Sequence, residues 1–333
     1  MKKNKNKIKV GLFGVGKFGT YHLQNLLEIP EIELVGFCDI DPEKQKLIPQ
    51  KYNIKYYSQS DLIDLVDVVD VVVPTISHFG IAKEALQNGK HVFIEKPVTQ
   101  TVPQIKELND LAKGNNLKIS VGHIERFNPV FVKTKEKYDL KPLFIEIHRV
   151  GKFNPLRGVD VPVIMELMIH DLDLLLYMVN AEVTNIYASG TKVLSSEYDI
   201  VNARIEFANG TVANITASRI SDKKLRKVRI FQKNLYISMD FLNSKADVYS
   251  LLSSGNNQNN FNSKILSKIP KDFSKIINYD RIEPQKYNAL RMELSEFIKS
   301  IINDDTTPIV TGEDGFKALE LATKIEESIK NKQ

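Results

Sequence analysis

Three glycines near the start of the chain have the spacing of a dinucleotide-binding loop. Gly14, Gly16 and Gly19 form a GxGxxG pattern that follows an apolar run and precedes a helical pattern. In such a loop the first glycine permits a tight turn, the second lets the backbone approach a pyrophosphate, and the third lets the helix pack closely on the strand. The phosphate then meets the positive end of the helix dipole. We therefore expect this loop, with Lys17 and Phe18, to bind a dinucleotide.

A carboxylate at the end of the next predicted strand matches the ribose of such a cofactor. Asp39 follows Gly19 by 20 residues, the spacing expected for an acid that binds the adenosine ribose hydroxyls. Because this carboxylate would repel a 2′-phosphate, it favours NAD over NADP. Asp41 strengthens that preference, whereas Lys44 would weaken it by folding back. The alternative is that both acids are ordinary turn residues before Pro42.

The segments that hold these residues predict a parallel sheet flanked by helices. Between residues 8 and 121, short β-branched runs alternate with helical patterns, as in βαβ units. Residues 71–73 are apolar without alternation, as expected of a strand covered on both faces. The predicted strands are 8–13, 33–37, 55–57, 68–73, 91–94 and 118–121, and the predicted helices are 19–28, 61–65, 80–88 and 103–113.

After Gly122 the pattern changes to strands joined by short connectors. Asn209-Gly210 is a type I′ hairpin signal and Lys233-Asn234 is a weaker one, so this sheet is predicted to be mainly antiparallel. One long helix at 163–179 packs on one face of it. The predicted strands are 143–149, 183–193, 199–207, 211–219, 226–231 and 235–241.

The last part of the chain begins with a segment that lacks periodicity. Residues 253–284 are rich in Asn, Lys and Ser and predict a surface loop, with a lid or a subunit contact as the alternative. Helices at 287–302 and 315–329 close the chain and can pack back on the first domain. The predicted fold class is therefore α/β, with an N-terminal Rossmann dinucleotide-binding domain at 1–122. A C-terminal α+β domain with a mainly antiparallel open sheet follows at 123–333.

Composition argues against a nucleic-acid partner. The chain has 333 residues, of which 42% are hydrophobic, and this length favours two domains. The formal net charge of +5 is accounted for by five lysines among the first nine residues, because 46 basic side chains stand against 41 acidic ones. Such an arm is typical of a disordered, solubilising tail. No basic stripe interleaved with aromatic residues supports binding of DNA or RNA.

Composition also argues against a membrane span and a metal site. The most apolar long stretch, 161–179, contains Glu, His and Asp side chains that would be costly in lipid. Cys38 is the single cysteine, which leaves no intramolecular disulfide and fits a reducing, cytoplasmic setting. No set of His and carboxylate residues has the spacing of a metal site.

Ligands of parallel sheets bind beyond the carboxyl ends of the strands, which is where we expect the two domains to meet. Three segments end there, at 74–78, 95–97 and 122–129. We interpret His22, on the first predicted helix, as a surface or packing residue. The candidate cofactor ligands are Pro74, Thr75 and His78, the last with a structural role as its alternative, and the candidate substrate ligands are His123, Arg126 and Asn128.

Over nearly its whole length the chain resembles the glucose-fructose oxidoreductase, inositol dehydrogenase and MocA (Gfo/Idh/MocA) superfamily. The resemblance rests on the glycine pattern, on Asp39, on the run 85–97 and on residues 166–173. Its most specific part is Glu95-Lys96-Pro97. The resemblance implies that Lys96 lies beside the nicotinamide and hydrogen-bonds the reacting hydroxyl, with Glu95 on the cofactor side. It also suggests a cis peptide bond before Pro97, which would help to fix the lysine.

The helix of this family carries an aspartate and, four residues later, a histidine that acts as general acid or base. This chain has Glu166 and His170 instead, a spacing that places both side chains on one face of an α-helix. An imidazole ordinarily has a pKa near neutrality, so the residue type of His170 suits the transfer of a hydroxyl proton. Glu166 would orient the imidazole or share the substrate's hydroxyls with it. The alternative is that both are polar residues capping a core helix.

The resemblance implies reversible, NAD(P)-dependent oxidation of a secondary hydroxyl of a sugar or sugar nucleotide. The runs 123–129 and 167–173 resemble a subgroup that oxidises the 3-hydroxyl of UDP-N-acetylglucosamine. An inositol or aldose dehydrogenase is the alternative among enzymes, and a non-catalytic, NAD-responsive binding or regulatory protein is the alternative of another class. An open sheet leaves one broad face to cover, so we expect a homodimer or homotetramer.

Overall fold

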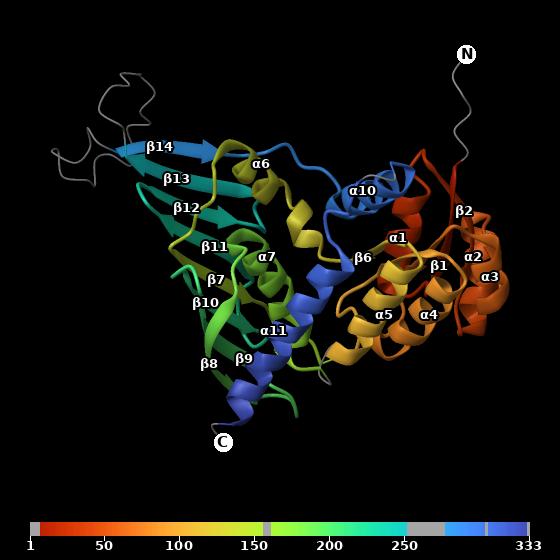
Figure 1. The fold of residues 1–333 in the computed structure, drawn as a ribbon, viewed down its shortest axis with the longest axis horizontal. Helices are drawn as coiled ribbons and strands as arrows, with labels where there is room; N and C mark the ends of the chain where they lie inside the picture. Colours follow the sequence, from red (N-terminus) through yellow and green to blue (C-terminus); the bar gives the residue numbers. More distant parts are fainter. Residues whose placement is uncertain (1–6, 156–160, 252–276, 304–305, 332–333) are drawn as a thin grey trace, which may run out of the picture. The chain divides into compact units, whose positions relative to one another are not determined.

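The chain divides into two compact units, each with its own sheet and hydrophobic core (Figure 1). The computed structural model describes residues 7–155, 161–251, 277–303 and 306–331. Unit 1 comprises Met1–Phe127 and Asn288–Glu320, and unit 2 comprises Asn128–Tyr287 and Leu321–Gln333. Most of the lysine-rich arm, residues 1–6, lies outside the described residues.

Unit 1 is built on a six-stranded parallel sheet with the order β3-β2-β1-β4-β5-β6. The strand order reverses between β1 and β4, and ligands of such sheets bind at the carboxyl ends of the strands beside that reversal. The predicted Rossmann fold and its strands are confirmed. The strands are β1 Ile8–Phe13, β2 Ile32–Cys38, β3 Lys55–Tyr56, β4 Val68–Val71, β5 His91–Ile94 and β6 Ile119–Val121.

Helices connect these strands and cover the sheet. Leu23 and Leu26 of the first helix and Phe297 of α10 pack with the sheet in one hydrophobic core. The core therefore joins the start of unit 1 to a segment from near the end of the chain. The helices are α1 Lys17–Leu26, α2 Pro42–Tyr52, α3 Gln59–Leu65, α4 Thr75–Gln87, α5 Val102–Gly114 and α10 Ala289–Ile302.

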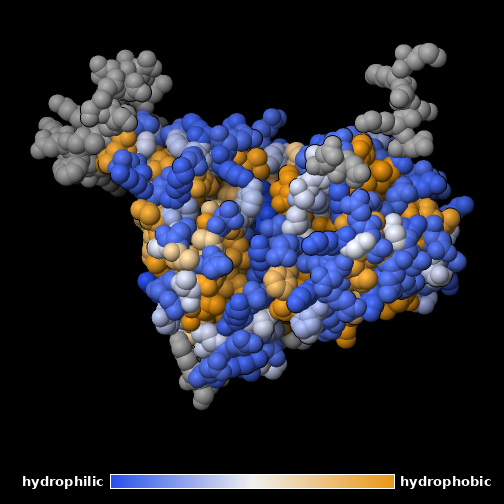
Figure 2. Space-filling model, viewed as in Figure 1, coloured by the Kyte–Doolittle hydropathy of each residue, from blue (hydrophilic) through white to orange (hydrophobic). Residues whose placement is uncertain are grey.

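Helix α2 is absent from the sequence prediction, and its composition explains why. Ile48 is its one buried residue, so the helix has almost no apolar stripe to detect. Pro42 stands in the first turn, and the Asp41 carboxylate caps the helix by accepting a hydrogen bond from the N–H of Glu43 at 3.0 Å. Local capping thus defines α2 where hydrophobic periodicity does not. Figure 2 likewise shows mainly hydrophilic residues on the visible face of unit 1.

Unit 2 contains an eight-stranded sheet with the order β14-β13-β12-β11-β7-β10-β9-β8. The pair β7 and β10 is parallel and every other pair is antiparallel, which confirms a mainly antiparallel sheet. The strands are β7 Phe144–Val150, β8 Val183–Thr191, β9 Ile200–Phe207, β10 Val212–Ser218, β11 Leu225–Gln232, β12 Leu235–Asp240, β13 Lys245–Leu251 and β14 Ile277–Ile282.

Two predictions about the end of this sheet are wrong. The prediction lacked β13, and it placed 253–284 in a surface loop, whereas Ile277–Ile282 forms β14. Residues 253–276 of that segment lie outside the described residues. Alternation along β14 is weak, because five of its six residues are only half-buried or exposed at this edge of the sheet. The pairing with β13, rather than an apolar pattern, makes this segment a strand.

The two hairpins are confirmed, but the predicted turn type at Asn209-Gly210 is wrong. A type I′ turn needs a positive φ at both central residues, and here only Gly210 has one, at 84°. The N–H of Gly210 donates to the carbonyl oxygen of Phe207 at 2.9 Å. The loop is therefore a longer turn that ends on a left-handed glycine. Between β11 and β12, Asn234 supplies the left-handed residue, with φ of 62°.

Helices cover one face of this sheet and form the core of unit 2. Apolar residues of α6 (Pro129–Lys137), α7 (Ile169–Val179) and the end of α11 (Gly312–Lys330) pack with inward-facing residues of β7 to β14. The predicted single α-helix at 163–179 is wrong in its first turn, because Ile164–Met168 is π-helical. Apolar spacing cannot distinguish these two helix types over five residues.

Two buried ion pairs stabilise unit 2. The guanidinium of Arg149 on β7 binds both carboxylate oxygens of Asp171 on α7, each at 2.8 Å. Arg219 binds Asp199 at 2.7 Å, and Asp199 is fully buried. Burial opposes ionisation of Asp199, but the N–H of Leu194 and the Arg219 guanidinium outweigh it and hold the pKa of this carboxyl well below its usual range. Asp199 is therefore a permanent buried anion.

Replacing this anion should destabilise the protein strongly. We expect Asp199→Asn to lower the free energy of unfolding by about 3 kcal/mol at pH 7, because it removes the charge that compensates a buried guanidinium. The contribution is present at neutral pH and is lost as pH falls below about 4, since the folded-state pKa is depressed. Denaturant unfolding at both pH values measures it.

Asp139→Asn is the matched control. Asp139 pairs with Lys141 at 2.6 Å, but both side chains are largely exposed. We expect this variant to change the free energy of unfolding by less than about 0.5 kcal/mol. Equal losses for the two variants would contradict a stabilising role for the buried pair.

Candidate functional site

The three glycines of the loop between β1 and α1 each have a distinct geometry. Gly14 has a φ of 90°, and a Cβ there would lie 2.6 Å from the carbonyl oxygen of Val72. A Cβ on Gly19 would lie 1.9 Å from the carbonyl oxygen of Gly14, so the helix can pack this closely only with glycine. A Cβ on Gly16 would meet nothing within 4 Å. The loop is thus tight on its inner side and open at Gly16, which is also the N-cap of α1.

Asp39 is attached directly to this loop. Its carboxylate accepts hydrogen bonds from the N–H of Val15 at 2.7 Å and from the N–H of Asp41 at 2.9 Å. The side chain is therefore held beside the glycines, as a ribose ligand must be. Lys17 and Phe18, which follow Gly16, are exposed at the start of α1.

Lys44 folds back onto the two acids. Its ammonium lies 3.6 Å from the carboxylate of Asp39 and 3.5 Å from that of Asp41. One positive charge therefore stands beside the carboxylate that we expect to select against a 2′-phosphate. Removing the charge of Asp39 would leave that lysine in place to bind the phosphate.

Residues 74–78 form the start of α4 rather than the loop that we predicted. Pro74 caps the helix and Thr75 begins it, so His78 lies in the first turn. A proline followed by polar residues resembles both a loop and a helix start, which accounts for the error. The ring of His78 is buried and lies 2.8 Å from the carbonyl oxygen of Val73 and 3.0 Å from that of Pro97. Burial lowers the pKa of this imidazole. The hydrogen bonds to the two carbonyl oxygens act in the opposite direction but do not outweigh burial.

The Glu95-Lys96-Pro97 run lies directly after β5, and the Lys96–Pro97 peptide bond is cis, as the resemblance suggested. The Glu95 carboxylate accepts a hydrogen bond from the N–H of Lys96 at 3.1 Å. Its other oxygen lies 3.2 Å from Nε2 of His22. Glu95 is therefore held by His22 and by the backbone of Lys96. At the other end of the run, the ring of His78 contacts the carbonyl oxygen of Pro97.

His22 is buried, which agrees with the packing interpretation and not with the surface one, but sequence reasoning missed its polar partners. Its Nδ1 lies 2.9 Å from the carboxylate of Asp70, on β4. The signal was available in the helical pattern, since Gly19, His22 and Leu26 lie on the sheet-facing side of α1. A histidine on that side must find polar partners.

The crossover residues occupy a short 3-10 helix, Ile124–Phe127, and the start of α6. Arg126 is buried, and its guanidinium binds Asp314 at 3.0 Å and the carbonyl oxygen of Ile309 at 3.0 Å. Asn128 caps α6 by accepting a hydrogen bond from the N–H of Val130 at 3.2 Å. These contacts give Arg126 and Asn128 structural roles in addition to the predicted contact with substrate. His123 is also buried.

In unit 2, Glu166 belongs to the π-helical turn and His170 to the first turn of α7. The prediction assumed the angle between the two side chains that four residues of an α-helix give. That angle is different here, because a π-helix has more residues per turn. The Glu166 carboxylate lies 3.4 Å from the guanidinium of Arg219, a partner that the sequence did not indicate. Arg219 follows β10, and only the fold brings it to this helix. Because Lys96 belongs to unit 1 and His170 to unit 2, their joint action stays a prediction.

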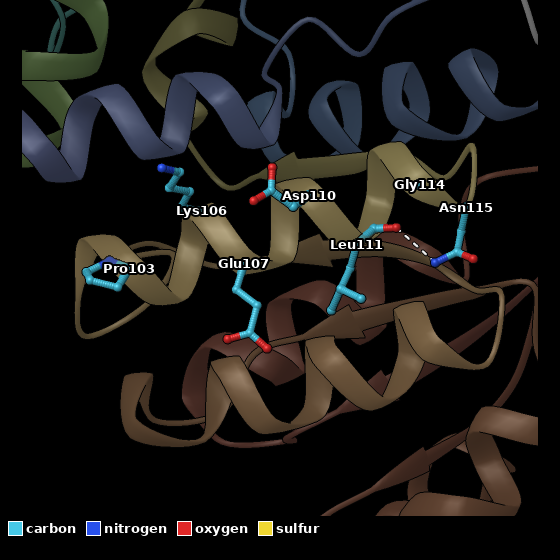
Figure 3. A pocket seen from close by; sticks show the side chains of 7 residues that line it. All are labelled: Pro103, Lys106, Glu107, Asp110, Leu111, Gly114 and Asn115. Carbon is cyan, nitrogen blue, oxygen red and sulfur yellow. Dashed lines mark hydrogen bonds between the residues drawn. The ribbon is translucent and has the colours of Figure 1, made fainter.

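A shallow depression along α5 is a separate feature (Figure 3). Figure 3 shows Glu107 pointing away from Lys106 and Asp110, and Glu107 pairs with Lys83 of α4 at 2.7 Å. The depression contains no residue of the glycine loop or of the 95–97 run, so it is not the predicted cofactor site. It is lined by Pro103, Lys106, Glu107, Asp110, Leu111, Gly114 and Asn115.

The described residues contain neither a helix that could span a membrane nor a cluster of metal ligands. No helix among them is both long enough and apolar enough to cross a membrane. Across the same part of the chain, no group of three or more His, Cys, Asp or Glu side chains is placed to hold a metal ion.

Family models match both halves of the chain. Residues 8–123 match a model described as an oxidoreductase family with an NAD-binding Rossmann fold. Residues 157–333 match the C-terminal alpha/beta domain of the same oxidoreductase family.

Individual relatives agree with these models. The chain is 35% identical over 243 residues to UDP-N-acetylglucosamine 3-dehydrogenase of Acidithiobacillus ferrooxidans, covering 73% of this chain and 77% of that protein. A solved structure of that dehydrogenase has a TM-score of 0.86, with 29% identity and 98% of both chains covered. The chain is also 26% identical over 238 residues to scyllo-inositol 2-dehydrogenase (NAD(+)) of Bacillus subtilis, covering 65% of this chain and 68% of that protein.

The contacts of Asp39 and Lys44 lead to a prediction about cofactor choice. We expect Asp39→Ser to weaken binding of NADH by about 10- to 100-fold, because charge-assisted hydrogen bonds to the ribose are lost. Binding of NADPH should strengthen, since Lys44 then pairs with Asp41 alone and its charge is available to the 2′-phosphate. Fluorescence titration with each nucleotide measures both constants.

The double variant Asp39→Ser/Lys44→Ala is the control. It should weaken NADH binding as the single variant does but lose the gain for NADPH. If NADPH binds equally well to both variants, Lys44 has no part in cofactor choice.

Proposed function

Because the chain belongs to the Gfo/Idh/MocA family of NAD-binding oxidoreductases, we propose that it reversibly oxidises the 3-hydroxyl of UDP-N-acetylglucosamine. The observation that supports this substrate is the 35% identity to an enzyme of that activity over about three quarters of both chains. The runs 123–129 and 167–173, which resemble the same subgroup, point to the same substrate. The product is then a 3-keto sugar nucleotide.

The residues of unit 1 fit the cofactor. The open backbone at Gly16 offers room where a pyrophosphate must approach, and the N-terminus of α1 favours its negative charge. Asp39 is held beside that loop and suits the ribose hydroxyls of NAD. When bound, the nicotinamide ring accepts the hydride that no side chain of the protein can take up. In our proposal Pro74, Thr75, His78 and Glu95 line the nicotinamide side.

Lys96 and His170 carry the proton chemistry in this proposal. Lys96 donates a hydrogen bond to the reacting hydroxyl and stabilises the negative charge that develops on its oxygen. His170 accepts the hydroxyl proton in the oxidative direction and returns it in the reductive one. His123 contributes to the substrate site, together with Arg126 and Asn128, whose contacts with Asp314 and Val130 also order the crossover segment.

Glu166 assists from the same helix as His170. Its carboxylate oxygens are hydrogen-bond acceptors, and one of them lies 3.4 Å from the Arg219 guanidinium. In our proposal this carboxylate orients the imidazole or binds a neighbouring hydroxyl of the sugar. The longer glutamate side chain, in place of the aspartate of the family, reaches toward Arg219 from the π-helical turn.

A cyclitol or free sugar is the second candidate substrate. Relatives named inositol dehydrogenases, including the Bacillus subtilis enzyme, favour it at lower identity. The same Lys96 and His170 would serve that reaction. The non-catalytic alternative is disfavoured, since both family models describe an oxidoreductase. The single cysteine fits a cytoplasmic setting, which stays part of the proposal.

We propose that unit 2 forms a homodimer or homotetramer through the outer face of its sheet, opposite the face covered by α6 and α7. A row of aromatic rings crosses five neighbouring strands there, with centroids 4.8 to 5.9 Å apart. These rings alternate along the strands with core residues such as Ile145, Ile230 and Ile237, so they lie on the outer face. Aromatic residues are enriched at protein interfaces. The row consists of Phe144, Phe231, Tyr236, Tyr249 and Tyr279.

The proposed reaction is tested by formation of reduced nicotinamide with NAD and UDP-N-acetylglucosamine, with trapping of the keto product. We expect turnover with the nucleotide sugar, and myo-inositol and free hexoses serve as competing substrates. We expect Lys96→Ala and His170→Ala to lower kcat by about 100- to 1,000-fold, because proton transfer and charge stabilisation are lost. Lys106→Ala, an exposed lysine on α5, is the control and should leave kcat unchanged.

Each outcome has a separate meaning. Turnover only with myo-inositol or a hexose would replace the substrate and keep the residues' roles. Full activity of Lys96→Ala or His170→Ala, with NAD bound normally, would refute the role of that residue.

The aromatic row is tested by light scattering coupled to size-exclusion chromatography. We expect the native chain to elute as a dimer or tetramer and Phe231→Lys to elute as a smaller species, since a buried charge opposes association. Leu65→Lys, at an exposed apolar position of α3, is the control. The same elution mass for Phe231→Lys as for the native chain would place the interface elsewhere.

A further inference from the structure

Three ionisable side chains of unit 1, two of them buried and one half-buried, form a chain of contacts that ends at the backbone of Lys96. His22 is 0% exposed and Asp70 is 1% exposed. The imidazole of His22 lies between two carboxylates, with Nδ1 2.9 Å from Asp70 and Nε2 3.2 Å from Glu95. The three residues come from α1, from β4 and from the residue after β5, so only the folded sheet brings them together.

The ring of His22 is best satisfied in its doubly protonated form. A carboxylate only accepts hydrogen bonds, so a ring that contacts one at each nitrogen needs an N–H at both. Burial opposes this charge, but Asp70 and Glu95 outweigh it and raise the pKa of His22 to about 10. Asp70 and Glu95 are the charged groups that face the ring. Burial raises the pKa of Asp70, and the charge of His22 opposes this rise.

Glu95 connects this chain to the lysine. Its second oxygen accepts the N–H of Lys96 at 3.1 Å, so the carboxylate spans from His22 to the backbone of the lysine. Burial opposes ionisation of Glu95, but His22 and the charge of Lys96 outweigh it and lower its pKa. Gly122 leaves room for this carboxylate, since a Cβ there would lie 2.7 Å from it.

We propose that His22 is a positioning residue of the dehydrogenase site, which clamps the Glu95 carboxylate and thereby fixes the backbone from which Lys96 reaches its substrate. The inference rests on the proposed function, because it assigns a purpose to the placement of Lys96. His22 itself touches neither the substrate nor the cofactor in this scheme. Asp70 holds the ring from behind, and His78 holds Pro97 on the other side of the lysine.

If His22 only stabilised the fold, its replacement would have a different effect from the loss of a positioning residue. Buried ion pairs often contribute little net stability compared with apolar groups of similar size, whereas misplacing a reacting group by about 1 Å can cost about 100-fold in rate. Loss of the clamp should therefore act on kcat. Loss of packing alone should act on the melting temperature and leave kcat of the folded protein intact.

The test compares His22→Gln with Asn25→Ala in the full chain. Asn25 lies on the same helix, is also buried and binds Asn288 at 2.6 Å, but it does not touch Glu95. We expect His22→Gln to lower kcat by about 10- to 100-fold, with KM and the Kd for NAD changed less than about threefold. Asn25→Ala should lower the melting temperature and keep kcat. Equal kcat values for the two variants overturn the proposal.

Two further variants complete the test. One is used if His22→Gln does not fold, and the other keeps the contact with Glu95 while changing Asp70. In His22→Gln/Asp70→Asn the buried carboxylate of Asp70 is also removed, so this variant replaces the single one if that does not fold, with the same expected loss of kcat. Asp70→Asn alone lets a neutral ring keep an Nε2–H bond to Glu95, and we expect it to retain kcat within about threefold. A loss in Asp70→Asn as large as in His22→Gln overturns the clamp through Glu95.

A measurement without substrate separates this inference from the proposed function. Lysines are labelled by reductive ¹³C-methylation in the apo protein, and the signal of Lys96 is assigned with Lys96→Arg. We expect His22→Gln, but not Asn25→Ala, to shift or broaden that signal. An unchanged Lys96 signal overturns the clamp even if the enzyme is active. A shifted signal in a chain that turns over no sugar supports the clamp and rejects the proposed substrate.

Discussion

The close approach of α1 to β1 is the constraint on which the cofactor side of the molecule depends. A Cβ on Gly19 would lie 1.9 Å from the carbonyl oxygen of Gly14, so this packing is open only to glycine. It places the N-terminus of α1 directly after β1, with Gly16 open beside it. One turn further along the helix, the same packing brings His22 within reach of carboxylates on two strands. The proposed phosphate site and the proposed support of Lys96 therefore both depend on the packing of this one helix.

Buried charge follows the same rule in both units. Asp39 is compensated by backbone N–H groups and Asp199 by Arg219 and three N–H groups, whereas Asp70 is bound through one of its oxygens to His22. Such groups are costly to bury unless a donor or an opposite charge pairs with them. In unit 1 they converge behind Lys96, whereas in unit 2 they surround the helix of Glu166 and His170. The polar network thus lies next to the residues that the proposed reaction uses.

The prediction was most accurate where local pattern and tertiary structure agree. The strands of the parallel sheet were correct because their apolar runs are covered on both faces, and the hairpins were correct because Gly210 and Asn234 favour left-handed backbone. Errors arose where tertiary pairing decides the structure. β14 is a strand only because β13 lies beside it, and α2 is a helix that buries little.

The sequence by itself determined the family, the glycine loop with Asp39, and the identity of Lys96 and His170 as candidates, because each depends on residue type and short spacing. Only the tertiary structure decided which groups surround them. His22 meets Glu95 across 73 positions of the chain, and Arg219 meets Glu166 across 53. No local pattern encodes such contacts, since they exist only when strands and helices from distant segments pack together. The π-helical turn before His170 is likewise visible only in the structure, since apolar spacing does not distinguish it from an α-helical turn.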